Sequence, residues 1–201
     1  MENINSSFFK DDETGTKMTF LFVAKTDLVI NQAHFAWQSD DQNNMFRVNL
    51  PWQNGTIFID HASRAGRLEV SGQTELTGSI ESYFYERDGA NARLYRSGVE
   101  IGNTTGLTAV MPETSGHFYL ADDHTNANRT NMDFYALFFW NRILTDEEKQ
   151  KLFLFAKKTF STKKAANPAT VIKPSLTHLY INDYLLNHAE CHYQIDRATS
   201  S

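Results

Sequence analysis

The sequence predicts an all-β fold, a two-layer antiparallel β-sandwich with one short C-terminal helix and an extra C-terminal strand or tail. Two features of the 201 residues indicate this class. The aromatic residues are mostly Phe (15) and Tyr (8), which pack well on the pleated, half-buried surface of a sheet. From Met18 onward, short runs of aromatic and β-branched residues alternate with clusters of Gly, Asn, Asp and Ser, the usual residues of turns. With 41% hydrophobic residues, the chain can bury a core of its own.

The strand candidates differ in how we expect them to be covered. Residues 18–24 (MTFLFVA) are apolar on both alternating faces, which is typical of a strand covered on both sides. Residues 45–50 (MFRVNL) alternate apolar with polar side chains, which predicts one exposed face. Residues 133–140 (DFYALFFW) form the most hydrophobic candidate and are expected inside a sheet. The other candidates are residues 56–60, 67–70, 79–87, 92–96 and 117–121.

One helix is predicted from about residue 146 to residue 160. Thr145 and Glu148 form a capping box, in which the Thr145 hydroxyl accepts a hydrogen bond from the first turn and Glu148 reaches back to Thr145. Its apolar side chains recur at helical spacing, so the helix can lie on a sheet of the sandwich with them: Leu152, Phe153, Ala156 and Phe160.

The chain is predicted to divide into four parts. Residues 1–17 form an N-terminal arm, and residues 18–160 form the sandwich. Residues 161–175 contain two prolines and are predicted to be an extended connector. Residues 176–201 form a C-terminal extension. Its apolar run at 176–186 either joins the chain's own sheet or adds a strand to an exposed edge of a neighbouring subunit.

Three segments carry a resemblance to a known superfamily: residues 50–70, 92–106 and 116–152. They resemble the laminin-G-like, concanavalin A-like jelly-roll domains, which include pentraxins, legume lectins and several glucanases. The pattern Pro-Trp-x-x-Gly-Thr-Ile-x-x-Asp, which begins at Pro51, is most similar to versions of this module in bacterial secreted proteins and in virion proteins of tailed bacteriophages. The resemblance implies a jelly-roll sandwich, but a fold alone does not assign a function.

The sequence offers no pair of carboxylates suited to glycoside hydrolysis. Glucanases of this superfamily carry their acids on one strand as Glu-x-Asp-x-x-Glu, and this string is absent here. The nearest acids are Glu81, Glu86 and Asp88, whose spacing is different. We therefore expect no catalytic residues and no enzymatic activity.

Residues 121–131 concentrate polar side chains in one loop. Carboxylate and amide oxygens of this kind are ligands that calcium prefers, but the same residue types also stabilise turns without any metal. No cofactor is therefore expected, and calcium stays open as an alternative. The candidate ligands are Asp122, Asp123, His124, Asn126, Asn128 and Asn131.

Carbohydrate recognition generally uses an aromatic ring beside a few polar groups. Trp52 follows Pro51 near a turn and is expected to be the exposed ring, although an interior location is the alternative for each tryptophan. Trp140 and His34 are interpreted as packed strand residues. The candidate sugar contacts are Trp37, Trp52, His61 and Arg64.

Charge, hydrophobic run length and cysteine content argue against several other classes of protein. A formal charge of −5 argues against sequence-independent binding of nucleic acid, because such binding needs clustered Lys and Arg side chains. The longest apolar run, residues 134–140, is too short to span a bilayer, and residues 1–15 do not resemble a secretory signal. Cys191 is the only cysteine, so no intrachain disulfide forms, and we interpret it as a small buried apolar residue.

These observations favour a non-enzymatic structural or adhesive surface module. We expect a capsid- or tail-associated decoration or fibre protein of a tailed phage, made in the host cytoplasm and located on the virion surface. Its partners would be other virion subunits or its own copies, as a homo-oligomer, and it would contact host-surface glycans. The alternative is a stand-alone carbohydrate-binding lectin, and the third candidate is a glycoside hydrolase. If the protein is not part of a virion, we expect it to be soluble and cytoplasmic.

Overall fold

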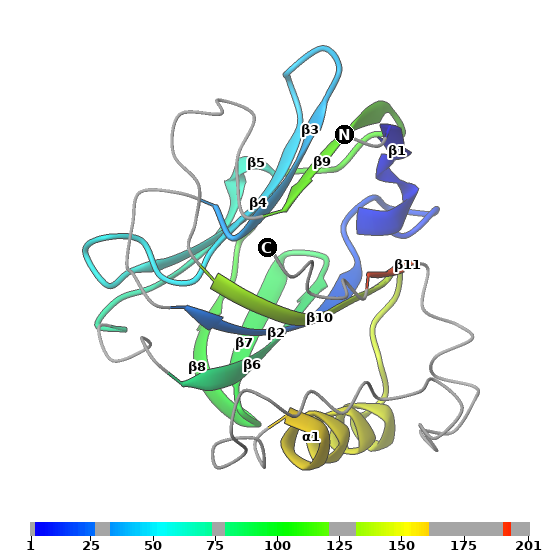
Figure 1. Cartoon of the computed structure of the whole chain (residues 1–201). Coiled ribbons are helices and arrows are strands. Elements are labelled where there is room, and N and C mark those ends of the chain that lie inside the picture. Colours follow the sequence, from blue (N-terminus) through cyan, green and yellow to red (C-terminus); the bar gives the residue numbers. More distant parts are fainter. Residues whose placement is uncertain (1–2, 27–32, 74–78, 121–131, 161–190, 194–201) are drawn as a thin grey trace.

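The computed structural model describes residues 3–26, 33–73, 79–120, 132–160 and 191–193. Two sheets, antiparallel throughout, lie face to face, and one helix lies on the outer side of the second sheet (Figure 1). This arrangement confirms the predicted all-β sandwich with a single C-terminal helix. No helix in the described part of the chain is long and apolar enough to cross a membrane.

The first sheet has five strands and the second has six. The order of the first is β1 (Asn3–Asn5), β9 (Ser115–Leu120), β3 (Phe35–Ser39), β4 (Met45–Asn49) and β5 (Ile57–Val70). The order of the second is β11 (Cys191–Tyr193), β10 (Met132–Trp140), β2 (Met18–Thr26), β6 (Ile80–Asp88), β7 (Asn91–Arg96) and β8 (Val99–Thr104).

Strand β2 is buried on both faces, as its apolar run predicted. Phe20 and Phe22 point into the space between the sheets, whereas Leu21 and Val23 point to the opposite side, toward the helix. Residues i and i+2 of a strand share a face, so one strand serves two separate hydrophobic clusters. The predicted central strand β10 also lies inside its sheet, between β11 and β2.

The space between the sheets is filled mainly by aromatic rings. Phe9 and Phe139 lie 5.0 Å apart between ring centroids, at an interplanar angle of 88°. Phe20 and Phe35 pack edge to face at 5.3 Å. Such edge contacts are favoured by the ring quadrupole and are worth about 0.5–1.5 kcal/mol each beyond their buried area. The phenylalanine side chains, in which the sequence is enriched, therefore form the main packing of the core.

The sandwich begins at Asn3, earlier than the sequence predicted. Strand β1 pairs with β9, and the short 3-10 helix η1 (Ser6–Phe9) inserts Phe9 into the core with 1% of its surface exposed. Residues 3–17 are therefore part of the folded domain and are not an arm outside it. A three-residue strand followed by one helical turn is too short to show a hydrophobic period, which is why the sequence pattern missed it.

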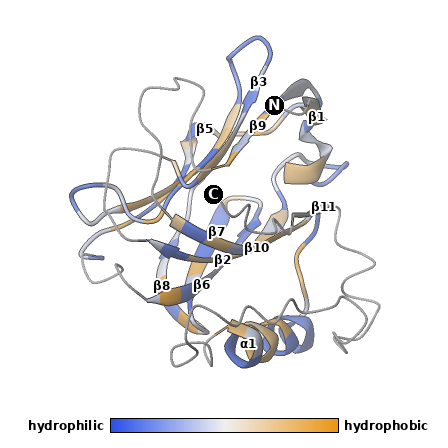
Figure 2. Ribbon diagram, viewed as in Figure 1, coloured by the Kyte–Doolittle hydropathy of each residue, from blue (hydrophilic) through white to orange (hydrophobic). Residues whose placement is uncertain are grey.

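Helix α1 (Asp146–Phe160) confirms the predicted capping box. The backbone N–H of Thr145 donates to Glu148 Oε2 at 2.8 Å, and the N–H of Glu148 donates to Thr145 Oγ1 at 3.3 Å. Arg142 also binds the Glu148 carboxylate at 2.8 and 2.9 Å, and these bonds lower the pKa of Glu148 to about 2. Figure 2 shows both hydrophobic and hydrophilic colours on the α1 ribbon, in accord with a helix that covers a sheet.

Part of the C-terminal extension joins the chain's own sheet. Strand β11 pairs with β10, with Cys191 opposite Phe139 and Tyr193 opposite Leu137. The predicted connector at 161–175 and the apolar run at 176–186 lie outside the described residues, and so does the side chain of Cys191.

Candidate functional site

The outer face of the five-stranded sheet carries a compact group of aromatic and charged side chains on β4 and β5. In the register of these strands, Arg47 lies opposite Asp60 and Asn49 lies opposite Phe58. Their neighbours of opposite parity, such as Val48 and Ile59, are fully buried in the core, so the Arg47 and Phe58 side chains point outward. We call this group the Trp52 patch; it consists of Arg47, Trp52, Phe58, Asp60 and Arg67.

A tight turn between β4 and β5 holds Trp52 at this surface. The N–H of Trp52 donates to Thr56 O at 2.7 Å, and the N–H of Gly55 donates to Trp52 O at 2.8 Å. Gly55 has φ +76°, a left-handed conformation that glycine adopts without a steric penalty. The Asn54 side chain closes the turn by accepting a hydrogen bond from the N–H of Thr56 at 2.9 Å. The turn therefore fixes the backbone of Trp52 at this surface.

The Trp52 ring is half-buried and rests against Phe58. The ring centroids lie 6.4 Å apart at an interplanar angle of 77°. The guanidinium of Arg47 lies 5.8 Å from the centroid of the Trp52 ring. No residue in the described part of the chain accepts a hydrogen bond from the indole N–H of Trp52. The ring thus has a fixed position, a partly exposed face and one unused donor.

A bidentate ion pair forms the other end of the patch. Arg67 binds the Asp60 carboxylate through Nε at 2.5 Å and Nη2 at 2.8 Å. Its guanidinium also lies 4.6 Å from the centroid of the Phe58 ring. Hydrogen bonding to Asp60 raises the pKa of Arg67, so this cation is held in place. The planar guanidinium, stacked on a ring and locked by a carboxylate, is a rigid surface feature.

A bend in β5 brings Arg67 back over Asp60. Ala62 has φ +70°, and Gly66 lies so close to the carbonyl of His61 that an added Cβ would be 2.0 Å from that oxygen. A side chain at Gly66 would therefore push the two halves of the strand apart. Since Arg67 follows directly, this bend positions the ion pair of the patch.

The structure corrects the assignment of His61 to a ligand site. His61 is fully buried between the sheets, where Nε2 contacts Phe9 O at 2.5 Å and Nδ1 contacts Arg87 Nη1 at 2.5 Å. Because Arg87 can only donate, Nδ1 is the acceptor and Nε2 carries the proton. Burial and the charge of Arg87 lower the pKa of His61 to about 3. Both ring nitrogens are thus used inside the protein, and His61 contacts no ligand at the surface.

The other predicted sugar contacts are separated by the fold. Trp37 is fully buried and donates its indole N–H to Ile4 O at 2.9 Å, so it is a core residue. Arg64 is exposed at the bend of β5 and is not part of the patch. Trp140 and His34 are buried, as expected for packed strand residues. Among the predicted aromatic and basic contacts, Trp52 alone reaches the patch.

The sequence analysis missed four members of the patch. The outward direction of Phe58 could have been predicted, because in the run TIFID this residue lies on the opposite face from Ile57 and Ile59. The same holds for Arg47 within its alternating strand. No sequence pattern predicted the pairing of Arg67 with Asp60, because this pairing depends on the bend in β5.

The candidate metal ligands are not described by the structure, and the candidate acids are either bound by other side chains or exposed. The loop with Asp122, Asp123, His124 and Asn126 lies outside the described residues. Within the described ranges, no three His, Cys, Asp or Glu side chains group so as to hold a metal ion. Glu86 is bound by Lys149 at 3.0 Å, and Glu81 accepts hydrogen bonds from Arg96 at 3.1 Å and Ser97 at 2.8 Å. Asp88 is exposed at the end of β6.

Comparison with known proteins defines the fold. No family model and no curated protein sequence matches this chain. The heptameric SAP-like pentraxin of Limulus polyphemus is similar over 75% of this chain and 75% of its own, with a TM-score of 0.54 at 11% identity. The binding domain of botulinum neurotoxin DC, solved with rat synaptotagmin II, is similar over 71% of this chain and 36% of its own, with a TM-score of 0.51 at 10% identity.

A third solved structure is domain 4 of a GH43 extracellular arabinanase from Geobacillus stearothermophilus, in complex with arabinotriose. It matches 66% of this chain, which spans 63% of that domain's chain, with a TM-score of 0.49 at 16% identity. The similarities to the pentraxin and to the neurotoxin domain show a jelly-roll-like β-sandwich. At such identities they show the fold alone.

Proposed function

We propose that this protein is a non-enzymatic carbohydrate-binding module and that the Trp52 patch is the surface that contacts the sugar. One observation carries the proposal. A half-buried tryptophan follows a tight turn, and its indole N–H has no acceptor among the described residues; it lies on the outer sheet face beside a second ring and two arginines. The apolar C–H face of a sugar packs on such a ring, while its hydroxyls need directional donors and acceptors beside it.

The rigidity of the patch supports binding. The turn at Gly55 fixes Trp52, and the Asp60 carboxylate fixes Arg67, so little side-chain freedom remains to be lost when a ligand binds. The Asp60 carboxylate is buried beneath Arg67 and orients it, whereas the Arg67 guanidinium, on a side chain that is 27% exposed, offers donors to sugar hydroxyls. The similar solved structures contribute only the scaffold to this argument.

A glycan array with matched variants tests the proposal. We expect the wild-type protein to bind a defined group of glycans and the Trp52→Ala variant to bind them at least about tenfold more weakly, a loss of about 1.4 kcal/mol. Arg67→Ala is expected to weaken the same glycans, whereas Arg64→Ala, which removes an exposed arginine outside the patch, leaves binding unchanged. Circular dichroism and melting curves verify that each variant is folded. Absence of binding to any glycan, or equal binding by wild type and Trp52→Ala, would contradict the proposal.

We further propose that the module acts on the surface of a tailed-phage particle, held by other virion subunits or by copies of itself. The support is the similarity of residues 51–60 to such virion modules. Deletion of residues 161–201 removes β11 and leaves the edge of β10 unpaired. We expect this variant to fold but to be lost from purified particles. A stand-alone lectin would be absent from particles even as the full chain, and a glycoside hydrolase would release sugar from the glycans it binds.

A further inference from the structure

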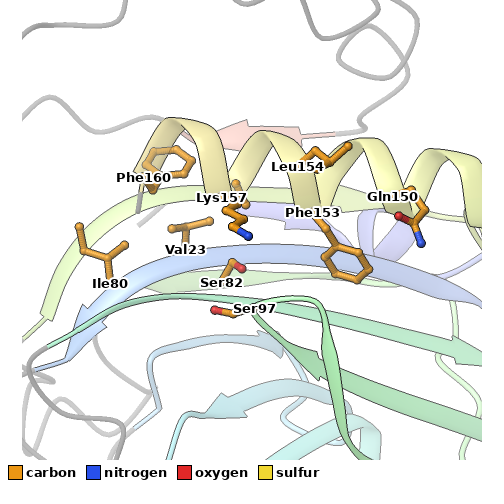
Figure 3. Close-up of a pocket in the computed structure, with 10 residues that line it drawn as sticks. Val23, Ile80, Ser82, Ser97, Gln150, Phe153, Leu154, Lys157 and Phe160 are labelled. Carbon is orange, nitrogen blue, oxygen red and sulfur yellow. The ribbon is translucent and has the colours of Figure 1, made fainter. Parts of the chain in front are cut away.

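A pocket of about 280 Å³ lies between α1 and the outer face of the six-stranded sheet, on the far side of that sheet from the core (Figure 3). Its apolar walls come from the two layers it separates. Val23 and Ile80 belong to the strand side, and Phe153 and Phe160 descend from the helix. Between these two rings the helix presents Ala156, whose short side chain leaves the space unfilled.

Polar groups also line the pocket: the Ser82 hydroxyl lies on its floor, and Gln150 and Lys157 of α1 border it (Figure 3). Ser82 is registered with Val23 on the adjacent strand, and its side chain points toward the helix between Phe153 and Ile80 (Figure 3). The Ser82 hydroxyl makes no hydrogen bond with any residue of the described chain. Its neighbour Ser97 donates its own hydroxyl to Glu81 Oε2 at 2.8 Å, so Ser97 can still act as an acceptor.

The size and lining of the pocket restrict what can occupy it. An apolar cavity of roughly 150 Å³ is sufficient for benzene, whereas sites for larger organic ligands usually begin at about 300 Å³. A single six-membered ring with one small substituent therefore matches the pocket. A sugar would bring several of its hydroxyls against the apolar side chains of Val23, Ile80 and Phe153, and each hydroxyl left without a partner there costs binding free energy.

We propose that this pocket binds a small phenol, with the ring between Phe153 and the Val23 and Ile80 side chains and the phenolic hydroxyl bonded to Ser82. This inference goes beyond the glycan-binding function, because it concerns the other sheet and an uncharged aromatic ligand. A site that hydrogen-bonds a ligand hydroxyl discriminates against the analogue that lacks it, since the hydroxyl of the protein is then left unpaired.

Nuclear magnetic resonance titration of the full-length protein with phenol, toluene and glucose tests this inference. We expect saturable shifts around Ser82 and Phe153 with phenol, about tenfold weaker binding of toluene, and no binding of glucose at the pocket. The Ser82→Ala variant is expected to bind phenol about as weakly as the wild type binds toluene, whereas Ser71→Ala, the same change at an exposed position just after β5, leaves phenol binding unchanged.

A variant that fills the pocket tests the inference independently. Ala156→Leu is expected to abolish binding of both phenol and toluene, and Trp52→Ala is expected to abolish neither, which separates this site from the glycan patch. If Ala156→Leu does not fold, the Ser82→Ala comparison decides alone. Equal affinity for phenol and toluene, unchanged phenol binding in Ser82→Ala, shifts located elsewhere, or no saturation with phenol would each overturn the inference.

Discussion

The two outer faces of the sandwich differ in what covers them. The outer face of the six-stranded sheet is covered by α1, and its apolar side chains, including Leu21 and Phe84, form a second buried cluster with Leu152. The outer face of the five-stranded sheet keeps the Trp52 patch at the surface. The same alternating strand pattern therefore yields one face that α1 covers and one face on which no described helix lies, which is the face we propose for binding. Four experiments test or refine this contrast, in order of expected effect on stability.

The largest effect is expected on the covered face. Leu152 is 2% exposed and packs into the cluster beneath α1, so Leu152→Ala is expected to lower the free energy of unfolding by about 2–5 kcal/mol. Leu154 lies on the same helix but is 65% exposed, and Leu154→Ala is expected to change it by less than about 0.5 kcal/mol. Urea denaturation of both variants measures the difference. Similar losses in the two would show that α1 does not pack on the sheet in this orientation.

The next effect concerns two buried histidines, His34 just before β3 and His61 on β5. Burial lowers the pKa of both His34 and His61 to about 3, whereas the unfolded chain titrates near 6.5. Below pH 6.5 the unfolded state therefore takes up protons that the folded state does not, so stability is fully present above that pH and is lost as the pH falls. At pH 5 we expect about 2 kcal/mol of loss for each histidine.

Denaturant titrations between pH 7 and pH 5 measure this loss. The variant His61→Gln does not titrate, so it is expected to show a shallower decline of stability over this interval than the wild type, even if its stability at pH 7 is lower. A decline of the same slope in both proteins would contradict a neutral, buried His61.

A smaller effect is expected at the start of α1. Thr145→Ala removes the hydroxyl that accepts a hydrogen bond from Glu148, and it is expected to cost about 1 kcal/mol. Glu147→Gln is the control, because this side chain is 79% exposed and contacts only Lys151 within the described chain. Thermal denaturation of the two variants checks the prediction, and a cap that contributes nothing would leave both melting temperatures at the wild-type value.

The smallest effect on stability is expected in the patch, together with a large effect on binding. Arg67→Lys keeps the charge but loses the bidentate geometry with Asp60, so the free energy of unfolding is expected to fall by about 0.5–1 kcal/mol. Glycan affinity is expected to fall about tenfold, whereas Arg64→Lys alters neither quantity. Isothermal titration with a glycan identified on the array provides the affinity. Loss of stability without loss of affinity would make the ion pair a structural feature only.

Structural features that depend on residues close together in the sequence were predicted well. The capping box at Thr145 and Glu148, the bounds of α1 and the double burial of β2 each depend on neighbours within a few positions, whose pattern the chain itself displays. The site was predicted less well. Trp52 was expected to be exposed and is half-buried in the structure, and His61 was assigned to the surface although alternation with Ile57 and Ile59 places it inside.

The sequence by itself determined that this protein is a β-sandwich with one capped helix, because hydrophobic period and turn residues are local properties that survive in a linear chain. Tertiary structure alone decided which outer face stays open, that Phe9 joins the core, and that Arg67 meets Asp60. These contacts depend on the bend of β5 at Ala62 and Gly66 and on the pairing of β1 with β9. Long-range pairings and a backbone bend bring such groups together, and no local pattern in the sequence encodes that proximity.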